Sequence, residues 1–104
     1  MSATAFPPAY LDIVLEVLRD RREQTRERYG VDLLGVFGSV ARGDDTGASD
    51  VDILVSVSDR TGLFDLGAVW SELSDALNRR VDLVDRDGLR PGLREHVEGE
   101  LAPI

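Results

Sequence analysis

The sequence contains no cysteine, a single histidine and no long apolar run. The absence of cysteine excludes disulfide bonds, zinc–thiolate sites and thiol nucleophiles. His96 lies on a charged flank between Glu95 and Glu98, where a lone histidine is more often a surface residue than a catalytic base, so we assign it no role. No segment is apolar enough to cross a membrane and the N-terminus lacks a signal-peptide pattern, so the expected compartment is the cytoplasm.

Basic residues are also scarce, because 12 Arg and Lys face 20 Asp and Glu and the formal net charge is −8. Nucleic-acid backbones are bound by basic surfaces, so this balance argues against a direct nucleic-acid partner. An acidic protein that handles nucleotides is expected to meet them as a metal complex. The 104 residues are enough for a single domain, 1–104, with one modest core.

Hydrophobic periodicity predicts an alternation of helices and strands. The expected helices cover 9–29, a turn and short helix at 38–43, 62–78 and 89–101, and the expected strands cover 31–37, 50–57 and 80–84. Gly30 is placed to end the first helix. Its charged half, 19–28, mixes five arginines with acidic residues and is interpreted as a solvated face rather than a basic binding surface.

The helix predicted over 62–78 has an apolar stripe at helical spacing. Its members are Leu63, Leu66, Val69, Trp70, Leu73 and Leu77. Trp70 is in register with the stripe, so we interpret it as a core residue rather than as a platform for base stacking.

The rest of the chain is organised around the stretch from Gly35 to Val55, GVFGSVARGDDTGASDVDILV. Gly38 and Ser39 come directly after an apolar strand. A glycine at this point lets the backbone pass close to a ligand, and a serine suits the N-cap of a short helix. Free backbone N–H groups and the positive end of the helix dipole then favour a phosphate.

Two aspartates follow this Gly-Ser pair. Ten residues separate Ser39 from Asp50, and Asp50 and Asp52 lie two apart on a predicted strand, so their side chains project from one face. Neighbouring carboxylates repel each other unless a cation lies between them, and hard oxygen ligands suit Mg²⁺. Asp82 repeats this placement in RVDLV, and it is either a third site carboxylate or a solvent-facing strand residue.

Gly-Ser, ten residues, Asp-x-Asp and a third aspartate on a later strand together resemble the nucleotidyltransferase superfamily related to DNA polymerase β. The stretch GSVARGDDTGASDVDILV is most similar to its smallest branch, the minimal nucleotidyltransferases (MNT), and the similarity extends through RVDLV to LRPGLREHVEGE, over most of residues 31–101. The resemblance implies an α/β fold with a short mixed β-sheet packed with helices, and its motif core spans residues 31–85.

By this resemblance, Asp50, Asp52 and Asp82 are the catalytic, metal-binding carboxylates for two Mg²⁺ ions. Gly38 and Ser39 match the nucleotide-binding pair for ATP. Two roles stay open for Arg42, which also falls in the motif: it touches phosphate oxygens, or it pairs with a nearby acidic residue and pins the loop.

The resemblance implies metal-assisted in-line displacement at an α-phosphate. The acceptor is expected from a partner, because larger relatives use a second domain for that purpose. For an MNT protein the implied partner is a HEPN-type helical toxin, and the implied activity is transfer of AMP to a toxin tyrosine, which makes this chain an antitoxin. Two alternatives remain: a non-catalytic module that masks the partner, and an enzyme that modifies a small molecule such as an antibiotic.

Overall fold

The computed structural model describes residues 9–104, and residues 1–8 of the expected domain lie outside that range. The elements in chain order are α1 (Tyr10–Tyr29), β1 (Val31–Phe37), α2 (Gly38–Arg42), β2 (Val51–Val57), α3 (Leu63–Leu77), β3 (Val81–Asp85), the 3₁₀ turn η1 (Arg86–Gly88), α4 (Pro91–Glu100) and β4 (Ala102–Pro103). This is a mixed α/β fold, which confirms the predicted fold class. Within residues 9–104 no helix has both the length and the apolar character that a bilayer crossing requires.

The four strands form one sheet in the order β3-β2-β1-β4. β2 runs parallel to β3, whereas β1 is antiparallel to both of its neighbours, β2 and β4. The pairing of β1 with β2 shifts register between Leu33 and Gly35, as at a β-bulge. The shift changes the alternation of β1, so that Leu33 and Val36, three residues apart, are both fully buried.

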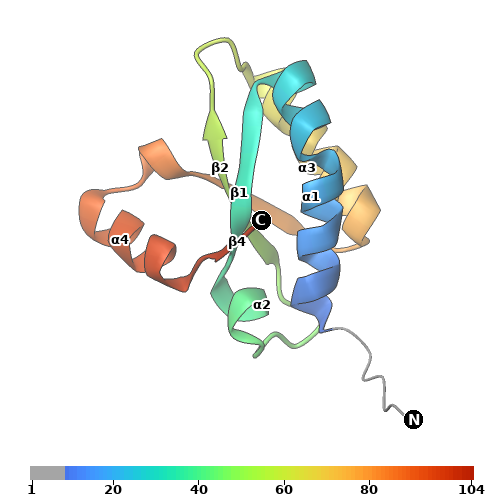
Figure 1. Ribbon diagram of the computed structural model, residues 1–104, viewed down its shortest axis with the longest axis vertical. Helices are drawn as coiled ribbons and strands as arrows, with labels where there is room; N and C mark the ends of the chain where they lie inside the picture. The colour runs from blue at the N-terminus through green and yellow to red at the C-terminus, as the bar shows by residue number, and fades with distance from the viewer. Residues whose placement is uncertain (1–8) are drawn as a thin grey trace.

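The main core lies between the sheet and the helix pair α1 and α3, which cover the same face in Figure 1. Helical spacing on α1 and α3 and alternation on the strands supply its residues. Fully or almost fully buried members include Val14, Leu18, Val31, Leu33, Ile53, Val55, Val69 and Leu73. The charged half of α1, predicted to be a solvated face, is mostly exposed. Its Arg22 is half-buried and donates to Asp32 on β1 at 2.9 Å.

The opposite face of the sheet is covered by α4 (Figure 1). Leu54 points away from the main core by strand alternation, yet it is fully buried, and Val97 of α4 is 4% exposed. This cover is partial. It leaves the end of the sheet near α2 accessible, because Asp50 at that end is exposed.

The end of the first helix follows the prediction made from Gly30. The first helix was expected over 9–29 and is found at Tyr10–Tyr29, ended by Gly30 in the left-handed region at φ +69°. The predicted C-terminal helix is shorter than 89–101. Leu101 leaves it at φ −66°, ψ 127°, because the chain turns there into β4, a strand that periodicity did not predict.

Trp70 was predicted to be a core residue of the α3 stripe, and this is wrong; the first residue of the stripe also lies outside the core. Leu63 is 83% exposed and Trp70 is 48% exposed. Trp70 lies at the rim of the sheet, where its indole N–H donates to the Val81 carbonyl of the edge strand β3 at 2.8 Å. Part of the apolar stripe of α3 therefore lies beyond the edge strand β3 and is not covered by the sheet.

Candidate active site

The candidate site forms where β1 ends and β2 begins, with the short helix α2 between them (Figure 1). Gly38 opens α2 with φ +76°, a conformation that side chains disfavour. A Cβ at this position would lie 2.2 Å from Oδ2 of Asp52. Glycine is therefore required here both by the positive φ and by the close approach of the Asp52 carboxylate.

Ser39 was expected at the N-cap of the short helix, and this prediction is wrong. The cap position belongs to Phe37, whose φ is −133°, and no side chain caps the helix. Gly38 takes up the sharp turn into the helix, so Ser39 falls inside the first turn and is half-buried. Gly43 closes the helix at φ +80°, with its N–H bonded to the carbonyl oxygens of Ser39 and Val40.

The three candidate aspartates lie on one face of the sheet. Asp50 and Asp52 are two residues apart, and the parallel pairing of β2 with β3 places Asp82 directly opposite Asp52. Burial first, and then the negative charges of Asp82 and Asp50, raise the pKa of Asp52 above its ordinary value. The carboxylates therefore act on one another, although they come from strands 30 residues apart in the sequence.

The donor set of this face fits Mg²⁺ because it consists of carboxylate oxygens. In the arrangement seen here, no three acidic or imidazole side chains among residues 9–104 converge as a metal cage. Asp50 instead lies 3.7 Å from the guanidinium Nε of Arg80. Burial and the negative charges of Asp82 and Asp50, which together raise the pKa of Asp52, favour a cation here, since a cation among the carboxylates would oppose both effects.

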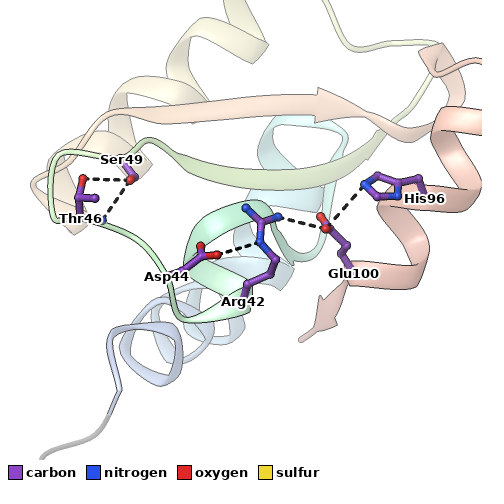
Figure 2. Close-up of polar contacts among 6 residues, drawn as sticks. All are labelled: Arg42, Asp44, Thr46, Ser49, His96 and Glu100. Atoms are coloured by element: carbon purple, nitrogen blue, oxygen red, sulfur yellow. Dashed lines mark hydrogen bonds and ion pairs between the residues drawn. The ribbon is translucent and has the colours of Figure 1, made fainter.

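The loop between α2 and β2 is held by Arg79, a residue that sequence analysis missed. Arg79 donates to Asp45 at 3.2 Å and to the carbonyl of Ser49 at 2.5 Å, and its guanidinium lies 4.5 Å from the centroid of the Tyr10 ring. Within the loop, the Thr46 N–H donates to Ser49 Oγ at 3.2 Å (Figure 2). Together these contacts hold the loop that leads to Asp50. No local sequence pattern signals the two hydrogen bonds of Arg79, because 30 or more residues separate it from its partners.

Figure 2 shows Arg42 between two carboxylates. Its Nε donates to Asp44 at 3.3 Å, and its Nη1 donates to Glu100 of α4 at 3.0 Å. The pairing with Asp44 agrees with one of the two roles left open for Arg42, whereas Glu100 was not foreseen. His96 lies one helical turn before Glu100, with Nε2 3.7 Å from the same carboxylate oxygen.

The fold and the carboxylate face define a nucleotidyltransferase. The family model described as Polymerase beta, Nucleotidyltransferase matches residues 22–101. That range covers both strands of the motif, the edge strand with Asp82 and all of α4. The chain therefore belongs to this family, and specifically to its minimal nucleotidyltransferases, which confirms the resemblance found in the sequence.

Several relatives share nearly the whole chain. This chain is 36% identical over 94 residues to the protein adenylyltransferase MntA of Thermococcus cleftensis. The aligned region covers 90% of this chain and 95% of that protein. A structure described provisionally as a minimal nucleotidyltransferase matches with a TM-score of 0.70 and 42% identity, over 86% of this chain and 95% of the other. A toxin–antitoxin complex with AMP-PNP matches with a TM-score of 0.63 and 26% identity, over 88% of this chain and 69% of the other.

Proposed function

We propose that this nucleotidyltransferase transfers AMP from ATP to a tyrosine hydroxyl of a HEPN-type helical toxin and thereby acts as an antitoxin. The acceptor oxygen forms a bond to the α-phosphorus, the bond to the β-phosphate oxygen breaks, and pyrophosphate and the hydroxyl proton leave. Two findings support this function: the relative named protein adenylyltransferase and the toxin–antitoxin structure that contains AMP-PNP.

The observation that carries the proposal is the placement of Asp52. Its carboxylate lies against the backbone of Gly38, beside Asp82 on the next strand, in a position that raises its pKa. Holding a carboxylate there costs free energy in the absence of a cation. Such a cost is typical of a functional site rather than of a structural one.

In this proposal Asp50, Asp52 and Asp82 hold Mg²⁺, and Gly38, Ser39 and Arg42 bind the phosphates of ATP. Bound Mg²⁺ supplies a Lewis acid at the α-phosphate and lowers the pKa of the acceptor hydroxyl. Gly38 exposes backbone at the point where the chain turns into α2, and the Arg42 guanidinium supplies a fixed positive charge nearby. Asp82, on the edge strand β3, would help to hold the ion that activates the acceptor hydroxyl.

The decisive experiment is to incubate the protein with its toxin partner, ATP and Mg²⁺ and to measure the intact mass of the partner. We expect the mass of one or more AMP groups with the wild type and none with Asp50→Asn or Asp52→Asn. Glu98→Gln is a matched control, because it removes a surface carboxylate that pairs with Arg94 on α4 and leaves the candidate site untouched.

Other outcomes identify the two alternative functions. If both aspartate variants neutralise the toxin fully and no mass change appears, the protein acts as a binding module. If the wild type modifies no protein but protects cells against an antibiotic, the acceptor is a small molecule. Digestion of modified toxin and fragment sequencing identify the acceptor side chain.

A further inference from the structure

Glu100 occupies a constrained position that the sequence motif does not include. It is the last residue of α4, and the following residues enter β4, which pairs with β1 at Gly35 and Val36. The fit at Gly35 is close, because a Cβ there would lie 2.3 Å from the Ala102 carbonyl oxygen. The backbone beside Glu100 is therefore attached to the same strand that leads into α2.

The Glu100 side chain uses this position to hold Arg42. Glu100 accepts from Nη1 of the guanidinium at 3.0 Å, while Asp44 accepts from Nε at 3.3 Å. Two carboxylates from different elements thus bind two different nitrogens of one planar group (Figure 2). A guanidinium held at two nitrogens is fixed in orientation as well as in position, whereas a single ion pair leaves it free to rotate.

This arrangement lies next to the candidate catalytic carboxylates. The charges of Arg42 and Glu100 both act on the Asp52 carboxylate. A further carboxylate is unfavourable in such an acidic surrounding. Stability alone does not explain it either, since a partly exposed ion pair contributes little to the stability of a fold.

We propose that Glu100 is a positioning residue, which holds the Arg42 guanidinium at the mouth of the site in the orientation that contacts the triphosphate of ATP. The inference rests on the proposed function, because it takes the phosphates as the ligand of Arg42. It assigns a role to the end of α4, 58 residues beyond Arg42. Glu100 itself touches neither nucleotide nor metal in this proposal.

The test is a double-mutant cycle between Glu100 and Arg42, measured by calorimetric titration with ATP and Mg²⁺. We expect Glu100→Ala to weaken ATP binding about fivefold, and Arg42→Ala to weaken it at least as much, because Glu100 acts through Arg42. Adding Glu100→Ala to Arg42→Ala should cause no further loss. In the transfer assay, KM for ATP should rise about fivefold while kcat changes less than twofold.

Two further variants separate orientation from charge and from folding. Glu100→Gln keeps the shape of the side chain and a weaker hydrogen bond, so its ATP affinity should lie between those of wild type and Glu100→Ala. Glu98→Ala, which breaks the ion pair with Arg94 in the same helix, should leave ATP affinity unchanged. Thermal unfolding of each variant checks that the fold persists.

Distinct results would overturn the inference. Additive losses in the cycle, or unchanged ATP affinity in Glu100→Ala, would show that Glu100 does not act through Arg42. Loss of the folding transition in both Glu100→Ala and Glu100→Gln would make the residue structural. If the wild type itself fails to bind ATP, the proposed function fails as well, and this result is distinguishable because it appears before any substitution is made.

Discussion

The Asp52 carboxylate occupies the space that a Cβ on residue 38 would need, and this explains why the motif begins with a glycine. We expect Gly38→Ala to lower the free energy of unfolding by at least about 2 kcal/mol, because a left-handed alanine costs about 1–2 kcal/mol and its Cβ would also displace the Asp52 carboxylate. Urea denaturation measures this loss.

Gly43 supplies a matched control for that substitution. It has a similar φ of +80°, but a Cβ there meets nothing within 4 Å. Gly43→Ala should therefore cost only the backbone strain of about 1–2 kcal/mol. Combining Gly38→Ala with Asp52→Ala should recover part of the excess, and equal losses for the two glycine variants would contradict a contact-based role for Gly38.

The raised pKa of Asp52 predicts a pH dependence of stability in metal-free protein. The unfolded carboxyl ionises near its ordinary value of 3.8, whereas the folded one ionises at a higher pH. Between these values the folded state binds more protons, so the contribution of Asp52 to stability falls as pH rises through this window and stays low at neutral pH.

Asp52→Asn lacks this ionisation and should be more stable than wild type at pH 7 in EDTA, by less than about 1 kcal/mol because the site is partly solvated. The advantage should vanish below pH 3.8. Denaturation curves at several pH values test it. A variant that is less stable than wild type at pH 7 would show that Asp52 has a structural role.

At the scale of elements, the loop between α2 and β2 depends on a residue from the connection between α3 and β3. Arg79 is 14% exposed and bonds Asp45, which is 19% exposed. Arg79→Met should cost about 2–3 kcal/mol, because it leaves a poorly solvated carboxylate and the Ser49 carbonyl without their donor. Amide hydrogen exchange should then accelerate across 43–50 before the rest of the sheet.

Arg80 is the natural control for this anchor, since it is adjacent in sequence but 85% exposed. Its replacement by Met should change the free energy of unfolding by no more than about 0.5 kcal/mol. Similar losses from both substitutions would mean that general charge balance, rather than the anchor, stabilises the loop.

At the scale of the whole molecule, ligand binding should appear as stability. ATP with Mg²⁺ at 100 times its dissociation constant should stabilise the fold by about 2.7 kcal/mol, which is several degrees or more in the unfolding midpoint of a domain this small. ATP with EDTA should stabilise it much less. An equal shift in the two conditions would remove the metal from the proposal, and the Asp52→Asn variant should show no metal-dependent shift.

Much of the fold and part of the site followed from local patterns. Alternation and helical spacing located the four helices and β1 to β3 to within a few residues, because burial on one face imposes these periods, but they missed β4. The same patterns failed for Trp70, since a helical stripe does not reveal where the sheet beneath it ends. They failed for Ser39 because Gly38, at φ +76°, makes the turn into α2 and the N-cap position falls to Phe37, so that Ser39 lies inside the first turn.

The sequence by itself determined the family, the absence of thiol chemistry, and the placement of Asp50 and Asp52 on one face of a strand, because these follow from residue identity and a period of two. The tertiary structure decided the rest. The register of β3 on β2 set Asp82 opposite Asp52, and the return of α4 and β4 to β1 brought Glu100 to Arg42. Strand register and helix docking depend on surfaces distant in the chain, and local periodicity does not encode them.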